Sequence, residues 1–228
     1  MSKYTHEQNE AAYSGNLGEA ASAPARLDKK SLIIIIVAAA LVVISITAII
    51  LAVALTAKPA TYRVEMDVEG YGTIKMTLDR KSAPQTVDNF VKLATEGFYN
   101  GLTFHRAVTD FVIQGGDPNG TGTGGSKDTI YGEFSSNGYY DNHISHYAGV
   151  ISMARSNDKN SASSQFFITL GDARNSLDGN YAGFGYVDDE SMTVVYAIAG
   201  YMIPLTSNGV VTDKTKQPVI TEVRVTPN

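Results

Sequence analysis

An uninterrupted apolar segment near the start of the chain constrains its fold more than any other feature. No charged residue occurs from Ser31 to Ala57, and Leu32 to Leu55 consists almost entirely of Ile, Val, Ala and Leu. As a helix these 24 positions would span about 36 Å, whereas the hydrocarbon core of a bilayer is about 30 Å thick. Because core helices of soluble proteins seldom carry so long an apolar run, the sequence predicts a transmembrane helix over residues 32–57.

The residues that flank this segment predict its orientation. Three basic residues precede it and two follow it, namely Arg26, Lys29, Lys30, Lys58 and Arg63. This excess modestly favours a cytoplasmic N-terminus and hence a single-pass protein of the cell membrane with an extracellular C-terminal domain. The alternative is a signal peptide cleaved near Ala52-Val53-Ala54, which would leave a secreted protein, although signal peptides have a shorter apolar stretch of about 7–15 residues.

The rest of the chain divides around the apolar segment. Residues 1–31 are poor in large apolar side chains and predict a disordered cytoplasmic tail. Residues 58–61 form a brief linker, and residues 62–228 are numerous enough for one domain with its own core. The net charge is −5, so we expect no nucleic-acid partner. The chain has no cysteine, which excludes disulfides, thiol nucleophiles and Cys-ligated metal sites.

Hydrophobic periodicity in residues 62–228 predicts a mainly β domain with two helices. Residues 62–68 and 73–78 alternate as an antiparallel hairpin, and residues 218–225 alternate as a last strand. A helix begins at Pro84 and ends before Gly97, and a second begins near Ser191. Short apolar pieces separated by glycine between Phe98 and Gly185 indicate further strands of a barrel or sandwich, and a closed barrel would leave no sheet edges.

Three patterns could suggest other chemistry and are weak. The GxGxxG spacing of residues 120–125 lacks the helix that a dinucleotide site requires, so a flexible or substrate-lining loop is the better interpretation. His143 and His146 could share a helix face, but no third metal ligand is convincing, and we expect a structural or solvated role and no metal site. A membrane-tethered hydrolase has no support, because no GxSxG motif and no pairing of a serine with a base is visible.

A set of phenylalanines with an arginine among them stands out instead. Phe104-His105-Arg106 is followed by Phe111-Val112-Ile113-Gln114, and later by Ser164-Gln165-Phe166-Phe167. Strand alternation predicts that Phe104 and Arg106 share one face and that Phe111 and Ile113 share another. The plainer alternative, that the phenylalanines are core and Arg106 is solvated, stays open on spacing alone.

Several motifs in series resemble one family. In order they are Phe104-His105-Arg106, residues 111–117 (FVIQGGD), residues 122–125 (GTGG), residues 149–154 (GVISMA), residues 164–168 (SQFFI), Leu177-Asp178-Gly179 and Phe184-Gly185. This series is similar to the cyclophilins, which are peptidyl-prolyl cis-trans isomerases. The resemblance covers roughly residues 62–226 and implies a closed eight-stranded antiparallel barrel capped by two helices.

The resemblance also implies a site. Arg106 matches the catalytic arginine, and Gln114 would orient it and touch the substrate carbonyl. The proline pocket would be lined by Phe111, Val112, Phe167, Leu177 and Tyr181. Ala154, Arg155 and Gln165 would shape the groove for residues before proline, near the Gly122 loop. Neither a metal nor a cofactor is expected, because isomerisation makes and breaks no covalent bond.

Four positions depart from the family pattern. Tyr181 stands where many members have histidine. Ser176 replaces the tryptophan of drug-sensitive members, which puts tight cyclosporin binding in doubt. Arg155-Ser156 replaces an Asn-Ala pair of many eukaryotic members and looks like bacterial members. The sequence therefore predicts a membrane-anchored isomerase acting on proline-containing exported or surface proteins; the alternative is a module that binds proline segments with little catalysis.

Overall fold

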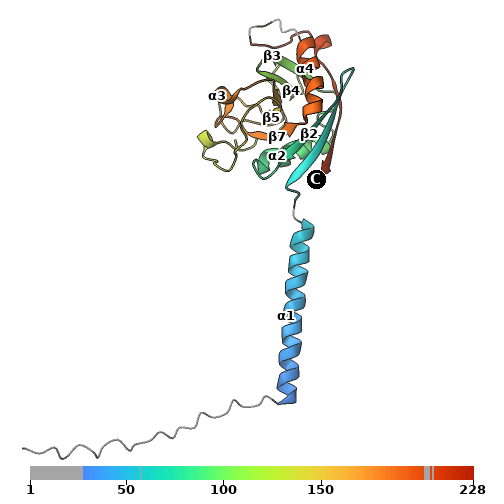
Figure 1. Ribbon diagram of the computed structural model, residues 1–228, viewed down its shortest axis with the longest axis vertical. Coiled ribbons are helices and arrows are strands. Elements are labelled where there is room, and N and C mark those ends of the chain that lie inside the picture. The colour runs from blue at the N-terminus through green and yellow to red at the C-terminus, as the bar shows by residue number, and fades with distance from the viewer. Residues whose placement is uncertain (1–27, 57, 203–205, 207) are drawn as a thin grey trace, which may run out of the picture. The chain divides into compact units, whose positions relative to one another are not determined.

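The computed structural model describes residues 28–56, 58–202, 206 and 208–228. The chain divides into two units, residues 1–57 and residues 58–228 (Figure 1). The described residues of the first unit form helix α1 (Lys29–Thr56). Of the predicted tail, residues 1–27 lie outside the described residues, and Lys29 to Ser31 already belong to the helix, since Asp28 caps it by accepting from the Ser31 amide at 3.1 Å.

Helix α1 exposes its apolar side chains from Leu32 to Ala52. The large side chains from Leu32 to Leu51 are 48–67% exposed. Two hydroxyl groups in its middle bond back to the helix, Ser45 to the Leu41 carbonyl at 2.8 Å and Thr47 to the Val43 carbonyl at 3.0 Å. The helix is therefore apolar on every side and long enough by composition to cross a membrane, a test that a signal sequence would also pass.

The second unit is built on one antiparallel sheet of eight strands. Their order is β3-β4-β6-β5-β7-β2-β1-β8. The strands are β1 (Thr61–Val68), β2 (Gly72–Asp79), β3 (Thr103–Val108), β4 (Val112–Asp117), β5 (Val150–Met153), β6 (Phe166–Thr169), β7 (Gly183–Val187) and β8 (Ile220–Pro227). The strict alternation of β1 confirms the predicted hairpin, with Val64 opposite Met76 and both side chains buried.

The prediction of a closed barrel is wrong, because the end strands β3 and β8 share no ladder. They meet at an isolated bridge between Thr103 and Val219. Residue Ile220 donates to the Leu102 carbonyl at 2.8 Å, and β8 then follows β1 away from this edge. Residues 209–211 bond to the remaining edge of β3, with the Ala107 amide donating to the Gly209 carbonyl at 2.9 Å. The sheet is thus an open half-barrel whose edge is covered by irregular chain.

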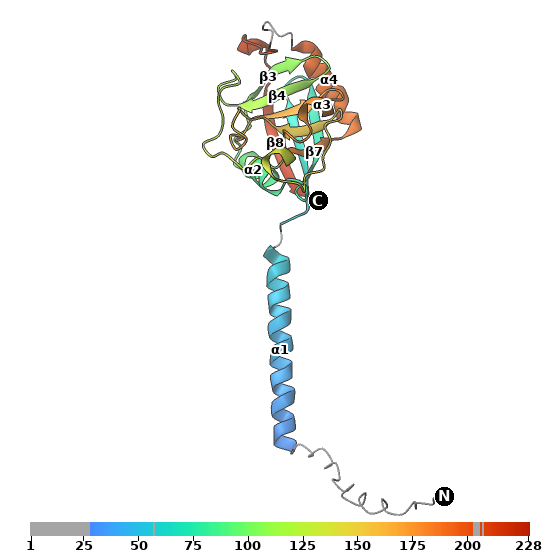
Figure 2. The same ribbon diagram turned by 90° about the vertical axis from the view of Figure 1, so that its left-hand side faces the viewer.

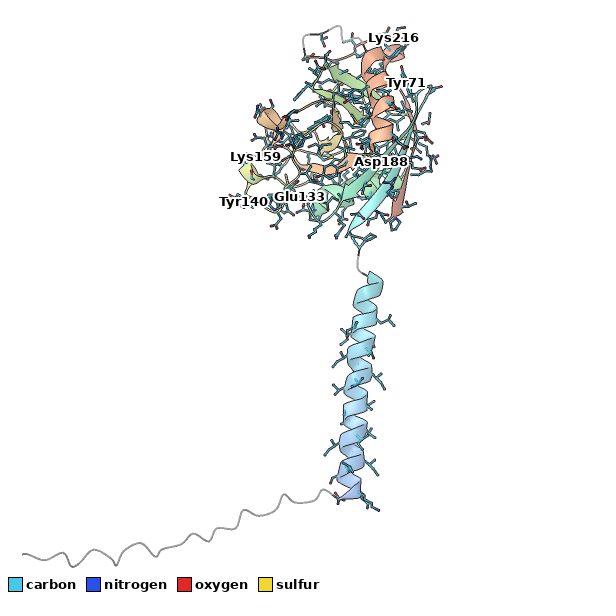
Figure 3. The ribbon with its side chains drawn as sticks, viewed as in Figure 1. Tyr71, Glu133, Tyr140, Lys159, Asp188 and Lys216 are labelled. Carbon is cyan, nitrogen blue, oxygen red and sulfur yellow. The ribbon has the colours of Figure 1, made fainter. Side chains whose placement is uncertain are left out.

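Two helices pack against the sheet, as predicted, and lie at its opposite ends in both views (Figures 1 and 2). They are α2 (Pro84–Thr95), which buries Phe90 and Leu93, and α4 (Met192–Tyr201), which buries Val195 and Ile198. Shorter elements are α3 (Arg174–Leu177), η1 (Ser135–Asn137), η2 (Asp189–Ser191) and η3 (Lys214–Lys216). The buried Glu133 side chain, labelled in Figure 3, accepts from the Gln85 and Thr86 amides at 2.9 and 2.8 Å and so caps α2.

A β-bulge in β3 overturns the predicted faces of this strand. Phe104 pairs with Gly115 and Arg106 pairs with Gln114, so His105 is an extra residue between them. Phe104 and Ala107 therefore both face the main core, whereas Arg106 points away from it. Phe111 does not share a face with Ile113 either, because it lies in the turn before β4 and packs with a second, smaller apolar cluster.

Candidate functional site

Arg106 is held on the outer face of the half-barrel by two hydrogen bonds to neutral groups. Its Nη1 donates to Oε1 of Gln114 at 3.1 Å, and its Nε donates to the carbonyl of Asn208 at 2.8 Å. Partial burial lowers the pKa of the Arg106 guanidinium, but an arginine stays protonated at any working pH. Arg106 is thus a fixed cation that keeps further N–H donors for a ligand.

A chain of amide groups continues from Arg106. Gln114 donates through Nε2 to Oε1 of Gln165 at 2.8 Å, and Gln165 donates through Nε2 to the Gly124 carbonyl at 2.7 Å. Each amide oxygen accepts and each amide nitrogen donates, which fixes the orientation of both side chains. The guanidinium is therefore connected to the glycine-rich loop across strands β3, β4 and the start of β6.

Beside Arg106 lies a cavity of about 250 Å³. Apolar side chains from Phe111, Val112, Ala154, Phe167 and Leu177 form one part of its wall, and Arg106, Gln114, Arg155 and Tyr181 form the rest. The Phe167 and Tyr181 rings meet edge to face, with centroids 5.6 Å apart. Val112, Phe167 and Leu177 belong to an apolar cluster separate from the main core. An apolar hollow with a cation at its rim is a place where a small apolar ring can bind beside a hydrogen-bond donor.

A second cavity of about 540 Å³ adjoins the first and shares Gln114, Ala154 and Arg155 with it. Its remaining walls are small and polar, from residues 122–126 and from Ser156, Ser161, Ser163 and Gln165. The buried carboxylate of Asp117 shapes the loop by accepting from the Asn119 and Gly122 amides at 2.8 and 2.6 Å. Burial alone would raise the pKa of Asp117, but these amide donors hold it below its usual range.

All the residues predicted from the resemblance line one of the two cavities. Those on the smaller cavity are Arg106, Phe111, Val112, Gln114, Ala154, Arg155, Phe167, Leu177 and Tyr181, and those on the larger one include Gly122 and Gln165. Ser176, where drug-sensitive members have tryptophan, lies exposed on α3 and outside both linings.

Sequence reasoning missed a buried group behind Phe167. His146 lies 2.8 Å through Nδ1 from Asp178 and 2.9 Å through Nε2 from the Ser152 hydroxyl, and its ring stacks on Phe167. The hydrogen bonds link a serine, a histidine and an aspartate as in the catalytic triad of a hydrolase. However, Ser152 and His146 are fully buried, so no substrate can reach them. The group therefore supports the pocket floor. No local pattern identifies it, because its members lie on three separate segments.

The comparisons with known proteins agree with this geometry. Residues 63–225 match the family model described as cyclophilin type peptidyl-prolyl cis-trans isomerase/CLD. A peptidyl-prolyl cis-trans isomerase of Synechococcus elongatus is 45% identical over 128 residues, which cover 56% of this chain and 82% of that protein. Peptidyl-prolyl cis-trans isomerase B of Bacillus subtilis is 46% identical over 120 residues, which cover 53% of this chain and 79% of that protein.

Solved structures give the same answer. The crystal structure of a Cryptosporidium parvum cyclophilin-type peptidyl-prolyl cis-trans isomerase superposes with a TM-score of 0.60 and 28% identity, covering 74% of this chain and 99% of that one. A second crystal structure of that protein, in the presence of the dipeptide Ala-Pro, superposes with a TM-score of 0.59 and 28% identity, covering 73% and 99% of the two chains. Since the family model spans nearly the whole second unit, the chain belongs to the cyclophilin-type peptidyl-prolyl cis-trans isomerases.

Proposed function

We propose that this isomerase speeds rotation about X-Pro bonds in exported or surface polypeptides, with Arg106 as its catalytic residue. The observation that carries the proposal is the Arg106 guanidinium fixed by Gln114 and Asn208 at the rim of the apolar cavity. The prolyl ring of the substrate would occupy that cavity, against Phe111, Phe167 and their neighbours. The Cryptosporidium relative studied in the presence of Ala-Pro supports a proline-containing ligand.

The chemistry needs a donor that acts only when the amide twists. Rotation must break the resonance of the peptide bond, with a barrier of about 18–20 kcal/mol, so uncatalysed exchange takes tens to hundreds of seconds. As the bond twists, the prolyl nitrogen gains a lone pair that the planar amide lacks. A guanidinium N–H directed at that nitrogen binds the transition state more tightly than the ground state.

Magnitudes indicate that Arg106 does not act alone. A charge-assisted hydrogen bond contributes roughly 1.5–3 kcal/mol, whereas a rate increase of about a millionfold requires about 8 kcal/mol. The apolar walls would supply the rest by gripping the ring while the preceding carbonyl swings, and by disfavouring the more polar planar amide. Gln114 would act here as a positioning residue, since its amide fixes the guanidinium.

The decisive test is Arg106→Ala in the full-length chain in detergent micelles. We expect the catalysed exchange rate of an X-Pro peptide, measured by exchange NMR, to fall at least tenfold while the thermal unfolding transition is retained, because the donor is lost but no core residue changes. Arg106→Lys is the matched control, since it keeps the charge without the planar fork, and it should recover only part of the rate.

Two other outcomes would contradict this proposal. Unchanged turnover in a folded Arg106→Ala variant would remove Arg106 from its role. A folded wild-type chain that binds proline peptides without accelerating their exchange would be a recognition module instead.

The same proposal places the enzyme at the cell membrane. The exposed apolar side chains of α1 support a bilayer partner for residues 32–57, because water would make their exposure unfavourable. With the N-terminus in the cytoplasm, the isomerase domain would face outward, where its clients would be exported chains that are still folding.

A further inference from the structure

Arg155 occupies the wall between the two cavities. It lies two residues after the end of β5 and lines both the apolar cavity and the larger polar one. Its guanidinium carbon lies 4.7 Å from the centroid of the Tyr181 ring and 5.2 Å from that of Phe134. A chain that places proline in the apolar cavity and its preceding residues in the larger one must therefore pass this cation.

The contacts of Arg155 hold its position without cancelling its charge. Its Nε donates to the Asn180 carbonyl at 3.0 Å, and its Nη1 donates to the Ser156 carbonyl at 2.8 Å. Within residues 28–56, 58–202, 206 and 208–228, none of the ion pairs includes Arg155. An arginine guanidinium has five N–H donors, and these two bonds hold it in place. Its remaining N–H groups are therefore available to a ligand.

The charge of the groove differs in sign from that of the whole chain. The chain carries a net charge of −5, yet the linings of the two cavities include Arg106 and Arg155 and neither Asp nor Glu. The buried carboxylate of Asp117, at the start of the glycine-rich loop, is turned to backbone amides of that loop. A concave surface with two cations focuses a positive potential on whatever lies within it.

We infer that Arg155 is a specificity-determining residue that selects substrates with a carboxylate side chain in the one or two residues before proline. This rests on the proposed function, since it deepens the substrate choice of the same site. An acidic side chain that enters the larger cavity meets Arg155 at its edge, where a carboxylate can accept from the free N–H groups of the fork. A lysine at the same place meets two positive charges and is rejected.

The expected preference is moderate because Arg155 is half-buried rather than enclosed. An exposed ion pair contributes little binding free energy, and an enclosed charge-assisted hydrogen bond contributes more. For the half-buried Arg155 we therefore expect a glutamate peptide to exchange about fivefold faster than the isosteric glutamine peptide. A lysine peptide should exchange more slowly than the glutamine peptide.

The experiment compares three forms of the full-length chain in detergent micelles on a matched peptide series: wild type, Arg155→Gln and Lys159→Gln. The peptides carry Glu, Gln or Lys directly before proline, or one residue earlier, and the readout is the ratio of catalysed exchange rates for Glu and Gln. Arg155→Gln should bring this ratio close to one, whatever happens to the rate itself. Lys159→Gln is the control. Lys159, labelled in Figure 3, is an exposed cation four residues after Arg155; it donates to the Ser136 carbonyl and lines neither cavity.

Salt provides a measurement that needs no variant. The wild-type Glu to Gln ratio should fall toward one at high ionic strength, because screening shortens the reach of an accessible charge. A ratio of one in wild-type protein that accelerates the Gln peptide would overturn the inference and leave the isomerase intact. So would a preference that survives Arg155→Gln. Failure to accelerate any peptide would instead contradict the proposed function.

Discussion

At the scale of single residues, two histidines beside the site have a pKa lowered by burial. His105, beside Arg106, and His146, behind Phe167, are both fully buried. Burial lowers the pKa of His105, although the charge of Asp117 partly offsets this effect. Burial also lowers the pKa of His146, and its hydrogen bond to Asp178 offsets it in part. Protonation of either ring therefore costs folding free energy.

This gives a pH dependence with a definite sign. In the unfolded chain both rings titrate near pH 6.5, whereas in the folded chain they bind protons only at lower pH. The stability is fully present above about pH 6.5 and is lost as the pH falls toward the folded pKa values, because the unfolded chain then binds more protons. We expect the midpoint of thermal unfolding to fall between about pH 7.5 and about pH 5.5.

A variant separates the histidine effect from general acid sensitivity. His146→Gln should lower the midpoint at about pH 7.5, since the bonds to Asp178 and Ser152 are disturbed, yet its dependence on pH should be shallower than that of wild type. An equally steep dependence in this variant would show that His146 does not titrate on unfolding.

At the scale of elements, the free edge of β3 is completed by a segment far along the chain. The Ala107 amide donates to the Gly209 carbonyl, and the Val211 amide donates to the His105 carbonyl, each at 2.9 Å. Gly209 has φ +85°, and a Cβ there would lie 2.4 Å from the Ala107 carbonyl oxygen. This glycine is therefore needed both for its left-handed backbone and for the close approach to β3.

Gly209→Ala should consequently damage stability and catalysis together. We expect a loss of about 1–3 kcal/mol in the free energy of unfolding, and a lower exchange rate because the Asn208 carbonyl no longer holds the Arg106 Nε. Denaturant unfolding and exchange NMR measure the two effects.

Gly70→Ala is the matched control for this variant. Gly70 has φ +75° with nothing within 4 Å of an added Cβ, so it carries the backbone penalty alone. It lies in the turn between β1 and β2, so the rate should be retained. If both variants kept full activity, the 208–211 segment would have no part in positioning Arg106.

The elements that the sequence predicted well are those whose signal is local. The alternation of residues 62–68 and the helical period after Pro84 need no distant partner, and both appear where expected. The bulge at His105 was missed because two residues on β3 oppose one on β4, and alternation assumes one for one. The contact of Arg106 with the Asn208 carbonyl was also missed, because the two residues are 102 positions apart in the chain. The residues of the pocket came from the family resemblance, since spacing alone left the phenylalanines and Arg106 ambiguous.

At the scale of the whole molecule, an apolar helix and a folded enzyme domain occur in one chain. The helix exposes its apolar side chains from Leu32 to Ala52, whereas the domain of residues 58–228 has a core of its own. If the helix is retained as an anchor, the protein should stay in the membrane fraction after an alkaline wash, and mass spectrometry should find an intact N-terminal segment. A mature N-terminus near Leu55 would instead establish cleavage and a secreted enzyme.

The pairing of the first strand of the domain with the last one bears on how such an enzyme matures. Strand β1 pairs with β8. The Asn208 carbonyl, which accepts a hydrogen bond from Arg106, comes 102 positions after that arginine in the chain. In the proposed orientation, translocation delivers β1 first and β8 last, so the arginine is aligned only once the chain has emerged almost completely. Slow X-Pro bonds ahead of that point, such as those at Pro84 and Pro118, must settle without help from the molecule's own site. In that orientation these bonds would therefore isomerise either uncatalysed or with the help of another isomerase molecule.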